Sequence, residues 1–234
     1  MRLNKIDSKD VQALSAYLES REAGVDQQMN AKVLDIIEQV RTRKDDALLE
    51  YTEKFDHVKL DSLIMSEEEI EAVMSKVDAS LIADLKEAAE NIACYHEKQL
   101  QEGYEIQKED GVYLGQRVIP LERVGVYVPG GRAAYPSTVL MNVIPAKIAG
   151  VKEIVMVTPP SADGSVDPVI AAAAHIAGVT RICKVGGAQA VAALAYGTQS
   201  IPRVDKIVGP GNAYVACAKR LVYGKVDIDM IAGP

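Results

Sequence analysis

Large aromatic residues and cysteine are scarce in this sequence of 234 residues. It contains no tryptophan, one phenylalanine and three cysteines. Without indole or phenyl rings, a core must be built mainly from valine, isoleucine, leucine, alanine and tyrosine. Cys94, Cys183 and Cys217 are odd in number, lie far apart and form no CxxC pair, so we expect free thiols and no disulfide. We assign none of them a catalytic role.

An excess of basic residues and a long apolar run are also absent. Acidic residues outnumber basic ones by 33 to 26, and the net charge of −7 argues against nucleic acid or an anionic membrane as a partner. The longest apolar-leaning stretch, 139–151, is interrupted by Asn142, Pro145 and Lys147 and is too short to cross a bilayer. The N-terminus shows no secretory signal. We therefore expect a cytoplasmic protein whose ligands are small molecules.

The few histidines lack the spacing of a metal site. His57, His96 and His175 form no HxxH or HxxxH pair and lie among residues expected to be helical. The residues alone therefore identify no metal ligand, and they show no recognisable group of catalytic acid, base and nucleophile.

Apolar residues recur at helical intervals through the first hundred residues. Ser8 is placed to cap a first helix, and further helical stretches cover 29–51 and about 80–101. Ser66 and Glu69 have the spacing of a capping box at the start of another helix. Each helix is expected to bury one apolar stripe. The stripes consist of Val11, Leu14 and Leu18; Val33, Ile36, Ile37, Val40, Leu48 and Tyr51; Ile70, Val73 and Met74; and Leu81, Leu85, Ala88, Ile92, Tyr95 and Leu100.

After residue 104 the apolar pattern changes from helical to extended. Between Tyr104 and Pro120 it has a period of two around Asp110-Gly111, which predicts a β-hairpin. From Val124 onward, short apolar runs alternate with helical segments, which predicts βαβ units, a mostly parallel sheet and a domain boundary near residue 120. The expected strands are 124–128, 153–157, 180–185, 204–208 and 227–231, and the expected helices lie near 137–149, 167–177, 188–196 and 212–222.

Three glycine-rich stretches, 124–131, 183–189 and 206–212, each follow one of these apolar runs. At the carboxyl ends of parallel strands, such loops can present backbone N–H groups to a nucleotide or another anionic ligand along one crevice. Alternatively, the glycines only permit tight turns between strand and helix. None of the loops matches the GxGxxG pattern, so no ribose-binding acidic residue can be assigned.

Three side chains in these loops are candidates for ligand contact. The ring of Tyr127 either borders the first loop and packs against a flat ligand, or lies in the core with its hydroxyl satisfied. Gln189 and Asn212 stand at helix starts behind glycine pairs, where an amide can both accept and donate hydrogen bonds. For Asn212, a helix N-cap is the commoner role.

Three polar residues after the first glycine loop are weaker candidates. Ser137 and Thr138 follow a proline and can cap a helix or touch a phosphate, and capping is the favoured interpretation. Arg132 either pairs with an anionic ligand or is solvated, as exposed loop arginines usually are.

Five motifs in order resemble histidinol dehydrogenase. They are the runs 124–131, 137–141, 185–190, 204–213 and 228–234, and the segments 41–48 and 51–56 extend the resemblance towards the N-terminus. The resemblance implies a homodimeric enzyme that oxidises L-histidinol through L-histidinaldehyde to L-histidine with two NAD+ and a zinc ion. It also implies an aldehyde-dehydrogenase-like fold with incomplete Rossmann-like domains, and NAD contacts at Tyr127, Gln189 and Asn212.

In the family, the motif at 232–234 continues into Ser/Thr-Glu, and the zinc ligands and a proton-transferring Glu-His pair follow later. The resemblance therefore implies a catalytically incomplete fragment with no metal or catalytic residue of its own. Residues 1–120 would form part of a first domain completed by further sequence, and 121–234 a Rossmann-like NAD-binding domain. The alternatives are a non-catalytic nucleotide- or phosphate-binding module, favoured if a natural stop follows Pro234, and a fragment that binds no ligand.

The first prediction concerns activity. The 234-residue chain is expected to show no dehydrogenase activity towards L-histidinol, even with zinc added, because the implied acid–base pair and metal ligands lie outside it. NADH formation measured by absorbance tests this expectation, and turnover above that of a protein-free control would contradict it.

Overall fold

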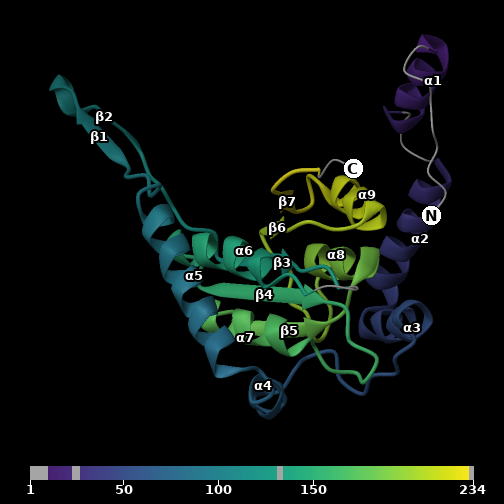
Figure 1. The fold of residues 1–234 in the computed structure, drawn as a ribbon. Coiled ribbons are helices and arrows are strands. Elements are labelled where there is room, and N and C mark those ends of the chain that lie inside the picture. The colour runs from purple at the N-terminus through teal and green to yellow at the C-terminus, as the bar shows by residue number, and fades with distance from the viewer. Residues whose placement is uncertain (1–9, 23–26, 131–133, 232–234) are drawn as a thin grey trace.

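A parallel sheet of five strands forms the centre of the described chain, and helices cover both of its faces (Figure 1). The structure, a computed structural model, describes residues 10–22, 27–130 and 134–231. The α/β class predicted from the alternation of strands and helices is confirmed. The helices are α1 (Val11–Glu22), α2 (Gln27–Arg43), α3 (Asp45–Asp56), α4 (Glu67–Met74), α5 (Ala79–Glu97), α6 (Pro136–Ile148), α7 (Pro168–Ala177), α8 (Gly187–Tyr196) and α9 (Ala213–Val222).

The central sheet has the strand order β5-β4-β3-β6-β7, with neighbouring strands parallel. Its strands are β3 (Arg123–Tyr127), β4 (Glu153–Thr158), β5 (Arg181–Lys184), β6 (Lys206–Val208) and β7 (Asp227–Ile228). All five lie within a few residues of their predicted positions. Counted along the chain, the order is third, second, first, fourth, fifth, which is the order of a Rossmann sheet. The direction of winding therefore reverses between β3 and β6.

Local signals explain where these elements begin and end. The run of β4 is apolar on both faces, as expected for a strand buried between two helical layers. At α7, the Asp167 side chain caps the first turn, Pro168 occupies the first helical position and Gly178 ends the helix with φ 89°. Such signals determine the elements one at a time, without reference to the sheet order.

The helices of the first hundred residues form outer layers on the sheet domain. On one face, α8 and α9 cover the sheet and α2 packs against both of them, with α3 beside α8. On the other face, α6 and α7 cover the sheet, and α4 and α5 pack outside them. The division into 1–120 and 121–234 stays a prediction. Buried apolar residues of both segments pack together in each of two clusters, one on each face of the sheet.

Two helix predictions from the sequence have different outcomes. The capping box is confirmed, since the Ser66 hydroxyl accepts a hydrogen bond from the Glu69 N–H and the Glu69 carboxylate accepts one from the Ser66 N–H. The continuous helix expected over 29–51 is wrong, because the chain breaks at Lys44, whose φ is 58°. The apolar stripe continues across the break, and the Lys44 ammonium donates to the Gly197 carbonyl at 2.9 Å.

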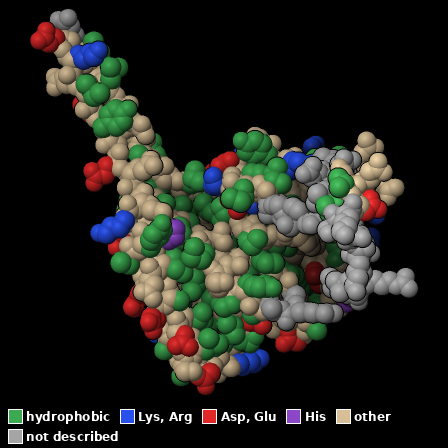
Figure 2. Space-filling model, turned by 45° about the horizontal axis from the view of Figure 1, so that its top comes forward, with side chains coloured by type: hydrophobic (Ala, Val, Ile, Leu, Met, Phe, Trp, Pro, Cys, Tyr) green, Lys and Arg blue, Asp and Glu red, His purple; other side chains and the backbone are tan. Residues whose placement is uncertain are grey.

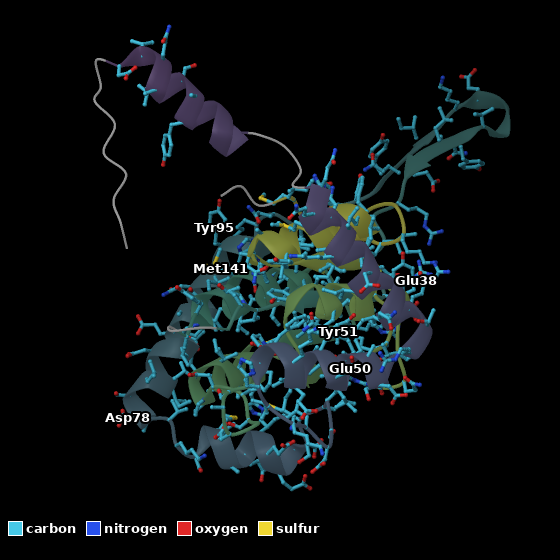
Figure 3. All side chains as sticks on the ribbon, turned by 90° about the vertical axis from the view of Figure 1, so that its right-hand side faces the viewer. Glu38, Glu50, Tyr51, Asp78, Tyr95 and Met141 are labelled. Carbon is cyan, nitrogen blue, oxygen red and sulfur yellow. The ribbon has the colours of Figure 1, made fainter. Side chains whose placement is uncertain are left out.

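The expected burial of α1 and of the end of α5 is also wrong. Val11 is 71% exposed, and α1 stands apart from the body of the protein (Figure 3). Asp10 caps this helix, accepting from the Ala13 N–H at 3.0 Å, and Ser8 lies outside the described residues. On α5, Leu85 is buried but Tyr95 is 67% exposed, because the helix extends beyond the layer it covers. Helical periodicity identifies the apolar face of a helix, but it does not show how far the surface against which that face packs extends.

The predicted hairpin is present and projects from the body (Figure 1). Strands β1 (Tyr104–Gln107) and β2 (Tyr113–Gln116) pair antiparallel, and a 3-10 turn at Glu109–Gly111 connects them, with Gly111 at φ 73°. All residues of both strands are exposed, and apolar side chains follow the arm in the space-filling view (Figure 2). An isolated two-stranded hairpin is marginally stable, so this arm presents apolar surface without cover from the described chain.

The capping role favoured for Ser137 and Thr138 is wrong. Helix α6 begins at Pro136, with Tyr135 at the N-cap position and no side-chain cap, which places both residues inside the first turn. Proline at the first helical position needs no hydrogen-bond partner for its nitrogen, so the helix starts one step earlier than a Ser cap would allow.

Where the winding reverses, β6 ends against the backbone of β3. Gly209 follows β6 with φ 106°, and a Cβ built at this position would lie 2.2 Å from the Tyr127 carbonyl oxygen. A side chain of any size would therefore force the two strand ends apart. Gly224 also has a positive φ, 91°, but a Cβ there would meet no atom within 4 Å.

These two glycines give a matched stability prediction. We expect Gly209→Ala to lower the free energy of unfolding by more than about 3 kcal/mol, because steric overlap adds to backbone strain. Gly224→Ala should cost only about 1–2 kcal/mol, since it incurs the backbone strain alone. Urea unfolding followed by circular dichroism measures both, and equal losses would show that the close approach to Tyr127 contributes nothing.

Candidate functional site

A cavity of about 950 Å³ lies at the carboxyl ends of the strands, beside the point where the winding reverses. Its walls come from the loops after β3, β4, β5 and β6 and from the faces of α2 and α3. Figure 3 views the molecule from the side on which α2 and α3 lie over the sheet domain. Crevices at this edge of parallel sheets are where ligands of α/β proteins bind.

The cavity brings the predicted site residues together. Tyr127 ends β3, Gln189 lies in the first turn of α8 and Asn212 caps α9, and all three line it. The glycine loops therefore open on one crevice, as the sequence suggested. Contact of these side chains with NAD stays a prediction. Arg132 and Gly131 lie outside the described residues.

Tyr127 lies in the core with its hydroxyl bonded, as the second interpretation predicts, and packing of its ring against a flat ligand stays a prediction. The residue is 3% exposed and belongs to the core, yet it lines the cavity. Its hydroxyl oxygen accepts a hydrogen bond from the Gly187 N–H at 3.0 Å, which leaves the hydroxyl proton able to donate. Burial raises the pKa of this hydroxyl to about 12, and the nearby Asp56 charge adds to the rise, whereas the Gly187 hydrogen bond opposes it. Tyr127 is therefore a neutral donor at physiological pH.

Gln189 is a buried amide without a protein partner. It occupies the third position of α8 and is 2% exposed, and its side chain makes no hydrogen bond to any described residue. The amide atoms are not fully enclosed in the protein interior, and the residue lines the cavity. An amide in this state at a cavity wall is suited to pair with a ligand.

Asn212 is the N-cap of α9, as the commoner interpretation predicts. Its side-chain oxygen accepts from the Val215 N–H at 3.1 Å. The amide nitrogen enters no hydrogen bond with the described chain and remains a donor at the cavity. Capping and ligand contact therefore use different atoms of this residue and do not exclude each other.

The loop glycines are required by packing within the chain itself. A Cβ at Gly130 or Gly186 would lie 2.3 Å or 2.8 Å from atoms of Pro159, and one at Gly211 would lie 2.3 Å from Val215. Tight turning and packing thus explain these glycines, as the alternative interpretation held. The same close packing draws the loops together around the cavity.

An ion pair between a buried lysine and a partly exposed aspartate, which the sequence reasoning missed, braces the third loop. The Lys219 ammonium, on a side chain 3% exposed, donates to the Gly209 carbonyl at 3.0 Å and to the Asp229 carboxylate. Asp229 also accepts from the Gly209 N–H at 2.9 Å, so both backbone groups of this glycine are held. The signal was present, because Lys219 stands four residues after Val215 on the buried face of α9.

A carboxylate on the opposite wall was also missed. Asp56, at the end of α3, lines the cavity, and its Oδ2 is buried with no hydrogen-bond partner in the described chain. Burial raises the pKa of this carboxyl, and the nearby His57 offsets part of the rise. Its position after Phe55 in an amphipathic helix carried no sequence signal for function.

The described residues offer binding groups but no catalytic centre. They contain no cluster of three His, Cys, Asp or Glu able to hold a metal, so the implied zinc has no ligands to assign among them. Cys183 is fully buried, and burial raises the pKa of its thiol to about 12, which makes it a poor nucleophile. No helix among them is long and apolar enough to cross a membrane.

The cavity presents groups that suit an anionic or polar ligand. The N-terminus of α8 starts at Gly187 with no acidic residue in its first turn, which favours an anion such as a diphosphate. The donors of Tyr127 and Asn212, the unpaired amide of Gln189 and the buried oxygen of Asp56 supply further polar contacts. What this arrangement can do is bind and orient a nucleotide.

Comparisons with known proteins agree with one family. The model of the histidinol dehydrogenase family matches residues 19–234. Histidinol dehydrogenase of Geobacillus kaustophilus is 59% identical over 91% of this chain and 50% of its own length, and that of Clostridium acetobutylicum is 53% identical over 100% and 54%. A crystal structure of histidinol dehydrogenase from Elizabethkingia anophelis superposes with a TM-score of 0.85 at 41% identity, covering 91% of this chain and 49% of that one. The chain spans about half the length of these relatives.

The hydroxyl of Tyr127 gives a prediction for the site's internal structure. Tyr127→Phe should lower the free energy of unfolding by about 1 kcal/mol and speed hydrogen exchange at the Gly187 amide, because that N–H loses its acceptor. Tyr196→Phe on the same helix is the control, since the hydroxyl of Tyr196 has no hydrogen bond to the described residues. Unchanged exchange at Gly187 in Tyr127→Phe would show that the hydrogen bond is not formed in solution.

Proposed function

The chain belongs to the histidinol dehydrogenase family, a family of oxidoreductases, and we propose that it forms the NAD-binding part of an enzyme oxidising L-histidinol through L-histidinaldehyde to L-histidine. The observation that carries the proposal is the convergence of three glycine loops on one cavity where the winding of the sheet reverses. This is the position at which dinucleotides bind to sheets of this order. Family membership supports the proposed reaction, and the cavity supports the proposal that these residues bind the cofactor.

Different residues at the cavity would contact different parts of NAD. The first turn of α8 and its free N–H groups suit the diphosphate, because the helix N-terminus carries partial positive charge. The amides of Gln189 and Asn212 suit polar groups on the ribose or the nicotinamide, and the neutral Tyr127 hydroxyl adds a donor. NAD, when bound, supplies the carbon that accepts the hydride. The residues of this chain bind and orient it.

The proposal includes a zinc ion in the reaction and a homodimer of the chain. Zinc would hold the substrate, although the described residues contain no group of three His, Cys, Asp or Glu that could bind it. A homodimer is supported by the apolar surface that the projecting hairpin exposes, since Tyr104, Ile106, Tyr113 and Leu114 are each about half exposed or more. No step of the reaction is assigned to zinc on the basis of these residues.

Calorimetric titration of NAD+ into the 234-residue chain tests the binding site. We expect measurable heat in the micromolar to millimolar range and about tenfold weaker binding for Gln189→Ala and for Asn212→Ala, because each loses a polar contact with the ligand. Asn142→Ala is the control, since Asn142 lies on α6 and does not line this cavity.

Two outcomes would contradict the proposal. A folded chain that releases no heat at millimolar NAD+ does not bind the cofactor on its own. Equal weakening by all three substitutions would show that the cavity is not where NAD+ binds.

A further inference from the structure

The cavity contains a carboxylate that the chain leaves unsatisfied. The Oδ2 atom of Asp56 is buried and has no hydrogen-bond partner, and neither oxygen of this carboxylate bonds to a described residue. Removing an ionised oxygen from water without replacing its hydrogen bonds is costly, more so than for a neutral group. A cost of this kind at a cavity wall favours a partner other than the residues that the structure describes.

The charges around Asp56 do not compensate for its burial. Desolvation raises the pKa of the carboxyl, and His57, the next residue, is the charged group that opposes the rise. Lys32 and Lys54 also line the cavity, but neither forms an ion pair with Asp56, and the Lys54 ammonium lies 5.5 Å from the centre of the Phe55 ring. The unsatisfied acceptor is therefore not part of a structural ion pair within the described chain.

The other carboxylates of the cavity are in a different state. Asp167 is occupied as the cap of α7, where its Oδ1 accepts from the Val169 N–H at 2.9 Å. Asp35 is exposed on α2, so water can satisfy it. Of the described acidic residues that line the cavity, Asp56 alone has a buried carboxylate oxygen without a partner.

The position where a Rossmann sheet carries its ribose-binding acid holds no acid here. That residue stands near the end of the second strand of the fold, which corresponds to β4. Strand β4 ends at Thr158 and is followed by two prolines, neither of which can accept a hydrogen bond through its side chain. Thr158 and Ser161 bring hydroxyls to the cavity from this region, but a carboxylate acceptor must come from another element.

Asp56 lies close to the groups expected to bind phosphate. The Tyr127 hydroxyl bonds to the Gly187 N–H at the start of α8, and the Asp56 charge is near enough to this hydroxyl to influence its ionisation. In a nucleotide, the ribose follows directly after the phosphate. Asp56 and the start of α8 line the same cavity, so a nucleotide whose phosphate lies at α8 would have Asp56 in the walls around it.

We propose that Asp56 accepts hydrogen bonds from the vicinal hydroxyls of a ribose of NAD, and that its charge disfavours a 2′-phosphate at that ribose. The helix α3 then supplies, across the cavity, the acceptor that β4 lacks. A carboxylate can accept from both hydroxyls of a diol at once, and it repels a phosphate in the same place. The inference rests on the proposed NAD site and adds to it a residue that determines selectivity between NAD+ and NADP+.

Calorimetric titration of NAD+ and NADP+ into three versions of the 234-residue chain tests the inference. For the unaltered chain, NADP+ should bind at least about tenfold more weakly than NAD+. In Asp56→Asn, NAD+ binding should weaken about tenfold and the difference between the two ligands should shrink by a similar factor, because the charge is gone while the shape is kept. Asp35→Asn, which removes an exposed carboxylate of the same cavity, should change neither value.

A melting curve without ligand separates ligand binding from a structural role. Asp56→Asn should melt at the same temperature or higher, because it removes a buried charge that has no partner. A clear fall in melting temperature would reveal a structural partner for Asp56 and would overturn the inference.

The titration distinguishes failure of the inference from failure of the proposed function. If the unaltered chain binds NAD+ and Asp56→Asn keeps both the affinity and the preference over NADP+, the role of Asp56 is refuted and the NAD site stands. If the unaltered chain is folded but binds neither NAD+ nor NADP+, the NAD site itself is refuted, and the role of Asp56 with it.

Discussion

The contact between the ends of β3 and β6 is the constraint on which the rest of this structure depends. These strands are far apart in the sequence but adjacent in the sheet, and Gly209 lies against the Tyr127 backbone with no room for a Cβ. Lys219 and Asp229 hold both backbone groups of Gly209 from behind. Because this approach is fixed, the loop carrying Asn212 and the strand carrying Tyr127 open on the same cavity. A ligand site at a sheet edge needs such bracing, since the groups that bind must be held before the ligand arrives.

The helices before the sheet contribute a wall of that cavity. Helices α2 and α3 pack against α8 and close the side of the crevice that the sheet leaves open. Their stripe is buried as the periodicity indicates, and the break at Lys44 turns α3 so that its end reaches the cavity. The hairpin and the end of α5 contribute nothing to this site and instead expose apolar surface. The chain spans about half the length of these relatives.

Local signals in the sequence were reliable where the interaction is local. The capping box at Ser66 and Glu69, the turn at Gly111 and the alternation of strand and helix after residue 120 all appear in the structure where they were expected. Each depends on residues a few positions apart. The burial expected for α1 failed because a distant partner decides it, since α1 has the right period but little to pack against. The start of α6 at Pro136 is a local effect that was misread.

At the candidate site, too, some features follow from the local sequence and others from contacts between distant residues. The sequence by itself determined that Tyr127, Gln189 and Asn212 stand where strands end and helices begin. Strand ends and glycine turns are set by residues that are close together in the sequence. Only the tertiary structure decided which strands are neighbours, that Gln189 and Asp56 lack partners, and that Lys219 braces Gly209. Those facts depend on contacts between residues 10 to 82 positions apart, and the rules for parallel connections fix the handedness of a crossover but not the order of the strands.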